Sequence, residues 1–401
     1  MTYDVSAVRE RFPALRAGTA HFDGPGGTQT PAPVIEAMAK ALGGPLSVRG
    51  GVMPGEMAAE TLVVGFRQAM ADLLGAEPEG IVFGRSATQL TYDFARALAA
   101  TWAPGDEVVV SRLDHDANIR PWIQAAERAG AVIRWAEFDP ATGELPVAAV
   151  GGLLTERTRL VAVTAASNLI GTCPDVAGIA GLVHRTGALL YVDGVHRSAH
   201  DLVDVTELGA DFYVCSPYKF FGPHHGVLAA RPELLGTLRP DKLLPSTDAV
   251  PERFELGTLP YEMLAGTRAA VDFLAGLAPA AQGARRGRLR SAFAAIGGHE
   301  TVLRERTEQA LSAMDGVTVH SRAAERTPTL LLTFDGRAAA DAYRFLARTG
   351  VHAPAGSFYA VEASRRLGLG DTGGLRVGLS PYNDGDDIDR LLTGLTDFLK
   401  S

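Results

Sequence analysis

Short runs rich in β-branched residues alternate with helical patterns between about residue 60 and residue 230, and this alternation constrains the fold most. Helical patterns occur, for example, at 89–102, 119–129 and 176–185. Strands that alternate with helices favour a mostly parallel sheet with helices on both faces. We therefore predict an α/β fold with a seven-stranded sheet. The expected strands are residues 80–84, 107–111, 132–138, 160–165, 189–192, 212–215 and 226–230.

Polar residues follow several of these strands. In mostly parallel sheets, ligands bind at the carboxyl ends of the strands. Chemically useful side chains that come just after strands should therefore converge on one site. They are residues 85–88, His115, Asn168, Asp193 and Lys219.

Lys219 is one of only four lysines in a chain with 34 arginines. Arginine is effectively always protonated, whereas a partly desolvated lysine can lose its proton and attack a carbonyl group. Lys219 is therefore a candidate for Schiff-base chemistry, although a surface lysine in a loop explains the segment alone equally well. Asp193 ends another apolar run, and a buried aspartate can keep a pyridine nitrogen protonated.

The composition of the 401-residue chain is that of an ordinary globular protein of two domains, or of one large domain with a smaller partner. A net charge of −8 argues against a nucleic-acid partner, and the basic run at 285–290 is interpreted as a solvated face. Two cysteines provide no disulfide framework and fit a reducing, cytoplasmic location. Residues 1–11 lack the apolar core of a signal peptide, and no run of about 18 apolar residues predicts a membrane span.

The second half of the chain changes pattern. A helix is expected at 262–276, and a Pro-, Ala-, Gly- and Arg-rich stretch at 278–288 is typical of a domain junction. Strands follow at 329–334 and 375–378, and an amphipathic helix follows at 387–399. This pattern predicts a smaller α+β domain.

Two motifs carry a resemblance to a known family. Residues 192–196 match V-D-G-x-[QH], and residues 211–223 match D-F-x-x-x-S-x-x-K-x-x-G-P, followed by a glycine-led strand at 226–228. The chain thus resembles the fold-type I enzymes that use pyridoxal 5'-phosphate (PLP), and especially the class V aminotransferase group that contains the cysteine desulfurases.

The resemblance covers nearly the whole chain and implies its organisation. It implies a large PLP-binding domain at 17–277 and a small domain made of 1–16 and 278–401, with an N-terminal helix at about 7–15 near the small domain. It also implies a small-molecule amino-acid substrate, no metal, and a homodimer with the site at the subunit interface.

The resemblance further implies a phosphate site. Ala87 and Thr88 match the phosphate loop, and Ser216 matches the phosphate serine of the family. Tyr218 occupies the place of a histidine in desulfurases, and Thr258 matches a threonine that reaches the phosphate from the neighbouring subunit. Helix N-termini bind phosphate through free N–H groups, but taken alone the hydroxyl residues before the 89–102 helix favour an N-cap.

Around the cofactor ring, the resemblance assigns five residues. Lys219 holds the cofactor as a Schiff base, Asp193 contacts the ring nitrogen, and His115 stacks on the ring and exchanges protons with substrate. Asn168 faces the phenolic oxygen of the ring. His196 faces the same oxygen and stands where desulfurases mostly have glutamine. Lys219, His115 and Asp193 are the implied catalytic residues.

Arg376 matches the small-domain arginine that binds the substrate α-carboxylate, a role that suits the guanidinium fork. Plainer explanations remain open for some of these residues. The alternative for His115 is a loop histidine bonded to Asp114 or Asp116, and Asn168 precedes a glycine-containing turn where asparagine is common without function.

The chain departs from the desulfurase pattern at one place. Desulfurases carry a mobile catalytic cysteine on a small-domain loop before the carboxylate arginine, but residues 352–360 contain none. Cys173 and Cys215 lie instead near strand ends of the large sheet. A persulfide mechanism needs an exposed thiolate of low pKa that reaches the substrate sulfur.

The sequence therefore predicts a PLP-dependent C–S lyase acting on an S-substituted cysteine by β-elimination to thiol, pyruvate and ammonia. Decarboxylation coupled to oxidative deamination, transamination, epimerisation, desulfuration and a non-catalytic PLP-binding protein remain alternatives. The group that the chain resembles also includes the cysteine S-conjugate enzymes of lincosamide antibiotic biosynthesis.

The side-chain specificity of the substrate stays open. Candidate pocket segments are 24–28, 47–51 and 356–359, and the glycine-rich segment 24–28 is interpreted as a close-approach loop that lines the entrance. His224 and His225 are assigned to a polar turn.

Overall fold

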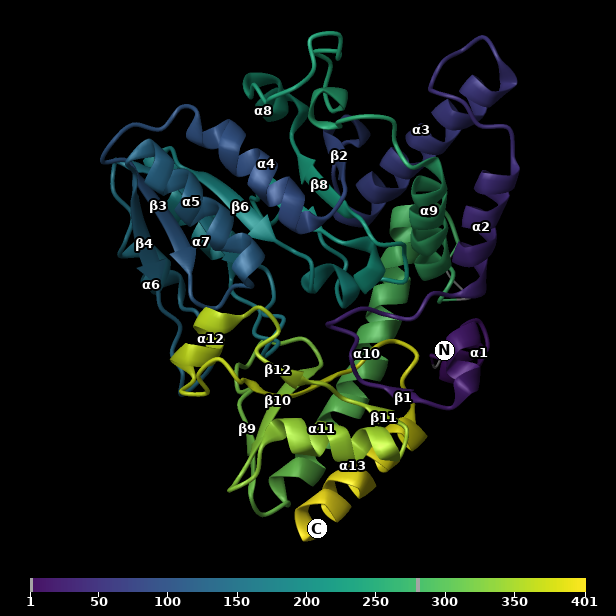
Figure 1. The fold of residues 1–401 in the computed structure, drawn as a ribbon, viewed down its shortest axis with the longest axis vertical. Coiled ribbons are helices and arrows are strands. Elements are labelled where there is room, and N and C mark those ends of the chain that lie inside the picture. Colours follow the sequence, from purple (N-terminus) through teal and green to yellow (C-terminus); the bar gives the residue numbers. More distant parts are fainter. Residues whose placement is uncertain (1–2, 279–281) are drawn as a thin grey trace.

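A seven-stranded sheet forms the larger part of the computed structural model, which describes residues 3–278 and 282–401 (Figure 1). The strand order is β2-β8-β7-β6-β5-β3-β4. The strands pair in parallel except β8, which runs antiparallel to β2 and to β7. The predicted mostly parallel sheet is confirmed. Its strands are β2 (Ile81–Gly84), β3 (Glu107–Ser111), β4 (Val132–Ala136), β5 (Thr158–Thr164), β6 (Leu189–Asp193), β7 (Phe212–Cys215) and β8 (Gly226–Ala230).

Helices cover both faces of this sheet because its strands are apolar on both faces. Val108 and Val110 of β3 point to the face covered by α4 (Ala87–Ala99) and α5 (Arg120–Ala129), whereas Val109 points to the opposite core. That alternation follows from the two-residue period of a strand. The opposite core includes residues of α3 (Pro54–Leu74), α7 (Val176–Val183) and α9 (Tyr261–Ala275).

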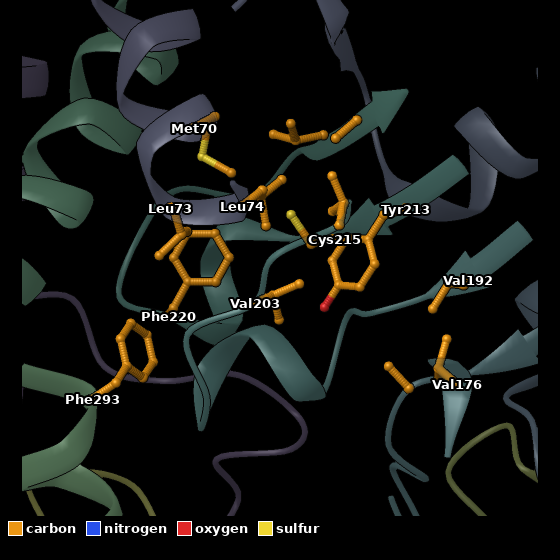
Figure 2. Close-up of a cluster of buried hydrophobic side chains, with 14 of the residues drawn as sticks. Met70, Leu73, Leu74, Val176, Val192, Val203, Tyr213, Cys215, Phe220 and Phe293 are labelled. Atoms are coloured by element: carbon orange, nitrogen blue, oxygen red, sulfur yellow. The ribbon is translucent and has the colours of Figure 1, made fainter. Parts of the chain in front are cut away.

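Figure 2 shows part of this second core, where Met70, Leu73 and Leu74 of α3 lie near Cys215 and Tyr213 of β7. Three further helices belong to this part of the chain: α2 (Ala32–Gly43), which packs on α9, α6 (Val147–Gly151) and α8 (Pro232–Thr237).

A smaller four-stranded antiparallel sheet lies at the other end of the molecule (Figure 1). Its order is β12-β13-β10-β9, with β9 (Val317–Val319), β10 (Thr329–Phe334), β12 (Ala355–Gly356) and β13 (Gly374–Gly378). The short strands β1 (Ala20–His21) and β11 (Val351–His352) pair in parallel beside it. The helices of this part are α10 (Arg285–Ser312), α11 (Ala339–Arg348), α12 (Val361–Arg366) and α13 (Gly385–Lys400).

The N-terminal helix differs from the single helix predicted at 7–15. The chain forms α1 (Val5–Arg9) and then a 3-10 turn, Pro13–Ala17, because Phe12 is extended before Pro13. Arg9 pairs with Asp384 and Asp387 at the start of α13, so this segment does pack near the small sheet.

The basic run at 285–290 is not simply a solvated face, which corrects the sequence interpretation. Arg285 pairs with Asp72 at 2.5 Å and with Asp272 at 2.7 Å, and Arg286 pairs with Asp204 at 2.9 Å. These arginines join the start of α10 to α3, to α9 and to the loop that contains Asp204. The predicted junction at 278–288 lies partly outside the described residues, and the domain boundaries stay a prediction.

Candidate active site

One cavity of about 640 Å³ lies at the carboxyl ends of the large-sheet strands, as the strand-end argument predicted. Thr258 is the exception among the implied site residues, because it lines a separate cavity with Arg85, Gln89 and His224. Within a single chain Thr258 is therefore not part of the main cavity. The implied residues that do line the main cavity are Ala87, Thr88, His115, Asn168, Asp193, His196, Ser216, Tyr218, Lys219 and Arg376.

Lys219 ends the 3-10 turn that follows β7, and its side chain is buried. Its Nζ donates hydrogen bonds to the carbonyl oxygens of Pro25 and Gly26, the second at 2.9 Å. Burial, and then the positive charge of Arg376, lower the pKa of Lys219 to about 7. A substantial fraction of this amine is therefore neutral and nucleophilic near neutral pH.

Asp193 is the last residue of β6, and it is buried at the sheet edge. Its Oδ1 accepts a hydrogen bond from the N–H of Val195 at 2.9 Å. Burial raises the pKa of Asp193 to about 6, so the carboxylate is mostly ionised at neutral pH. A buried carboxylate of this kind favours a protonated partner nitrogen.

His115 stands at the start of a short 3-10 turn after β3. Its Nδ1 accepts a hydrogen bond from the N–H of Ala117 at 3.0 Å, which places any proton of the neutral ring on Nε2. Burial, and then Lys219, lower the pKa of His115 to about 4, so the ring is neutral. The alternative of a bond to Asp114 is wrong, since Asp114 accepts hydrogen bonds from Ser111 at 2.5 Å and Asn118 at 2.6 Å.

The turn before α4 offers an anion site. Ser86 is the N-cap and accepts a hydrogen bond from the N–H of Gln89 at 3.0 Å, so the capping explanation applies to Ser86, which lines the cavity together with Ala87 and Thr88. A Cβ on Gly226 would lie 2.4 Å from the carbonyl carbon of Ser86. Glycine at this position therefore lets β8 approach the turn closely.

On the same side of the cavity, Ser216 is buried at the end of β7. The ring of Tyr218 stacks on the ring of His224, with centroids 4.6 Å apart and planes 8° apart. His224 thus supports a cavity residue, a contact that the polar-turn interpretation missed. His225 is buried instead, with Nε2 2.5 Å from Thr267 Oγ1.

Asn168 and His196 face the cavity from successive loops. Asn168 Nδ2 donates to the carbonyl oxygen of Phe358 at 2.9 Å, and its buried Oδ1 has no hydrogen-bond partner among the described residues. His196 Nε2 lies 2.9 Å from Thr327 Oγ1 and 3.0 Å from Thr329 Oγ1. Burial lowers the pKa of His196 well below its usual value, so its ring is neutral. The two threonines had no recognisable signal in the sequence.

Arg376 of β13 is fully buried, and three groups hold its guanidinium. Nη2 pairs with Asp23 Oδ1 at 2.6 Å, and Nη1 donates to the carbonyl oxygen of Asn168 at 3.1 Å. The guanidinium carbon lies 3.7 Å from the centroid of the Phe358 ring. Asp23 was missed, although it directly precedes the glycine-rich segment 24–28.

The segment 357–362 covers the cavity from the small sheet. Phe358 and Tyr359 adopt left-handed conformations, with φ of 52° and 59°. The N–H of Asp116 donates to the carbonyl oxygen of Tyr359 at 2.8 Å, and Arg112 pairs with Glu362 of α12. Bonds to the large-sheet loops thus hold this segment closed.

The segment 24–28 lines the cavity through Pro25 and Gly26. Its carbonyl groups accept from Lys219, and Thr28 N–H donates to the carbonyl oxygen of Tyr218 at 3.0 Å. A Cβ on Gly24 would lie 2.4 Å from Ser380 Oγ, so this segment does make a close approach, and the approach is to the end of β13 and the residues that follow it.

Together these groups fit PLP. The cavity presents an amine for an aldehyde, a carboxylate for a ring nitrogen, a helix N-terminus for a phosphate, and a buried amide oxygen with free hydrogen-bonding capacity. The fit rests on the chemistry of the whole set rather than on any one residue.

Comparison with known proteins agrees with this arrangement. The family model "Aminotransferase class-V" matches residues 20–391. A probable cysteine desulfurase of Pseudomonas aeruginosa is 32% identical over 97% of each chain, and an aminotransferase-like protein of Gibberella zeae is 32% identical over 98% of each chain. The cysteine desulfurase CsdA of Escherichia coli superposes with a TM-score of 0.88 and 27% identity, covering 100% of this chain and 99% of that structure.

The match spans nearly the full length of the chain and of its relatives, and the strand-end groups are those that the cofactor chemistry requires. The chain therefore belongs to the aminotransferase class-V family, and it is an enzyme whose cofactor is pyridoxal 5'-phosphate.

Proposed function

We propose that the enzyme is a C–S lyase that acts on S-substituted cysteines. An S-substituted cysteine and one water give a thiol, pyruvate and ammonium. The names of the relatives support the general class, since several are cysteine desulfurases or probable cysteine desulfurases. The choice of β-elimination over desulfuration rests on the positions of the two cysteines, neither of which suits attack on a substrate sulfur.

Neither cysteine is suited to attack a substrate sulfur. Cys215 is buried in the core (Figure 2), and burial raises the pKa of its thiol. Cys173 lines a different cavity with Arg197 and His200, and burial raises the pKa of this thiol as well. Within the described residues, the main cavity has Phe358 and Tyr359 on the small-sheet side. β-Elimination is favoured because it needs no cysteine nucleophile.

Lys219 and Asp193 supply the central chemistry. Bound PLP supplies an aldehyde that condenses with amines and a ring that accepts electrons from the substrate α-carbon. Lys219 Nζ holds the aldehyde and, when released, takes the α-proton, a role that suits an amine with a pKa of about 7. Asp193, mostly ionised at neutral pH, keeps the ring nitrogen protonated.

His115 and Arg376 position the reactants. The neutral ring of His115 would pack on the bound cofactor, and the Arg376 guanidinium would bind the substrate α-carboxylate. Tyr92, Pro121 and Tyr359 also line the cavity, next to the ion pair of Asp116 and Arg120, and their rings are available to contact the sulfur substituent.

The test incubates the PLP-loaded enzyme with S-methyl- and S-benzyl-cysteine and measures free thiol and pyruvate. Both products should appear in equal amounts, and Lys219→Ala should abolish them. Lys242→Ala is the matched control, because Lys242 lies in a surface loop beside Asp248 and should leave the rate unchanged. Carbon dioxide with an aldehyde, a keto acid with pyridoxamine phosphate, or alanine with the R–S group bound to the protein as a disulfide would each reject the lyase in favour of another reaction.

We also propose that two copies of the chain form a homodimer in which Thr258 of one copy approaches the phosphate of the other. Large apolar side chains are exposed along α2, α3 and the loop between them, including Leu42, Val52, Met53 and Met57. Exposed apolar patches mark interaction sites. Light scattering should give twice the mass of the chain, and a monomer that binds PLP fully would reject this arrangement.

A cytoplasmic location stays a prediction, which two free cysteines fit.

A further inference from the structure

Arg376 carries a buried positive charge that already has a carboxylate partner. Its side chain is 2% exposed, and Asp23 Oδ1 lies 2.6 Å from Nη2. Its Nε is buried without a hydrogen-bond partner in the part of the chain that the structure describes. A buried guanidinium needs a counter-ion, because desolvating an unpaired charge is strongly unfavourable. Asp23 supplies that counter-ion.

The position of Asp23 is fixed by its neighbours. Its main chain bridges to Gly378 at the end of β13, and its carbonyl oxygen accepts from the N–H of Gly26 at 2.9 Å. A Cβ on Gly26 would lie 2.1 Å from Asp23 Oδ2, so the carboxylate is folded against that glycine. The carboxylate also lines the main cavity, about a quarter exposed.

We propose that Asp23 is a positioning residue that holds Arg376 in the ligand-free enzyme and competes there with the incoming substrate carboxylate. This inference rests on the proposed role of Arg376 as the carboxylate site. Asp23 thereby weakens the binding of any simple carboxylate, and it favours ligands that also bring an amino group to the cofactor.

The physical reason is repulsion between two carboxylates at one guanidinium. Arg376 uses Nη2 for Asp23 and Nη1 for the carbonyl oxygen of Asn168, while Phe358 covers one face. A substrate carboxylate that takes the remaining N–H groups comes close to Asp23, and like charges at short range in a partly buried site repel strongly. Binding of a carboxylate ligand therefore requires Asp23 to weaken its ion pair with Arg376.

Lys219 gives Asp23 an alternative partner. The negative charge of Asp23 acts to raise the pKa of Lys219, so the two groups interact electrostatically. Lys219 Nζ already bonds the carbonyl oxygens of Pro25 and Gly26 in the same segment. When substrate takes over Arg376, the carboxylate of Asp23 is in place to stabilise the ammonium form of Lys219. A ligand without an amine does not release Lys219 from the cofactor, so Asp23 then has no ammonium group to replace its contact with Arg376.

The test measures propionate binding to the PLP-loaded enzyme by calorimetry and by the shift in melting temperature, so it does not depend on which reaction is catalysed. Asp23→Asn keeps the shape of the side chain and removes its charge. Its propionate dissociation constant should fall about tenfold. Its melting temperature should be lower than that of the wild type without propionate, and it should rise more when propionate is added. Neutral propionamide should have no effect.

Two comparisons separate this inference from its alternatives. Asp116→Asn removes another cavity carboxylate that pairs with Arg120, and its propionate affinity should stay within about twofold of the wild type. Arg376→Gln should lose propionate binding. If Arg376→Gln binds propionate normally, the proposed carboxylate site itself is wrong. If Arg376→Gln loses binding but Asp23→Asn binds propionate no better than the wild type, only the competition is wrong.

A crystal of the wild-type holoenzyme with propionate tests the same point without any variant. The Asp23 carboxylate should have moved away from Arg376 Nη2 where propionate is bound. If propionate and the Asp23 carboxylate both contact Arg376 and neither Asp23 nor Arg376 has moved, the inference is overturned. It is also overturned if the Asp23→Asn protein binds propionate more weakly while its PLP absorbance matches that of the wild type.

Discussion

Replacing Lys219 by methionine should stabilise the cofactor-free protein at neutral pH. Burial lowers the pKa of Lys219 from 10.5 to about 7, and this difference of about 3.5 corresponds to about 5 kcal/mol that the buried amine costs the folded state. Because the unfolded chain binds this proton more tightly, the cost is complete below pH 7 and disappears as the pH rises to about 10.5. Methionine fills similar space without a charge.

The pH dependence is the decisive part of this prediction. Between pH 7 and pH 9 the cost of Lys219 should fall by about 2 kcal/mol, so the stability gain of Lys219→Met should shrink by that amount. Urea titrations of both apoproteins at several pH values measure this difference. Lys242→Met, at a lysine in a surface loop, should show no such trend. A gain for Lys219→Met that is the same at pH 7 and pH 9 would refute the reasoning.

Three further predictions concern the covering segment, the turn before α4 and Cys173. Phe358→Ala removes the ring beside the Arg376 guanidinium, so KM for the amino-acid substrate should rise about fivefold to twentyfold in steady-state assays, with a smaller change in kcat; an unchanged KM would contradict the contact. Gly226→Ala places a Cβ 2.4 Å from the Ser86 carbonyl carbon, so PLP affinity measured by absorbance titration should fall at least about tenfold, and wild-type affinity would mean that the phosphate lies elsewhere. Cys173→Ser should keep the rate of thiol release within about twofold, whereas a complete loss would favour desulfuration over β-elimination.

Much of the large sheet could be predicted because its strands are short apolar runs separated by helices. Even there the ends differ, since β4 stops at Ala136 rather than at 138 and β5 begins at Thr158 rather than at 160. The convergence of Asp193 and Lys219 followed from their places at strand ends. Local pattern was sufficient because the parallel sheet itself brings those ends together.

The contacts that complete the site are long-range and gave no local signal. Asp23 and Arg376 are 353 residues apart, and the partners of His196 are Thr327 and Thr329, more than 130 residues away. The left-handed conformation of Phe358 was also unpredictable, because no glycine or asparagine marks it. Such features depend on how the small sheet packs against the large one.

Asn168 has a double attachment with a consequence for turnover. Its side-chain amide bonds the main chain of Phe358, and its own carbonyl oxygen accepts from Arg376. A ligand that displaces Arg376 therefore also disturbs Asn168, which helps to hold the covering segment 357–362 through Phe358. Entry of the amino acid and release of its product are therefore expected to be coupled to movement of residues 357–362, which Asp116 and Arg112 hold as well.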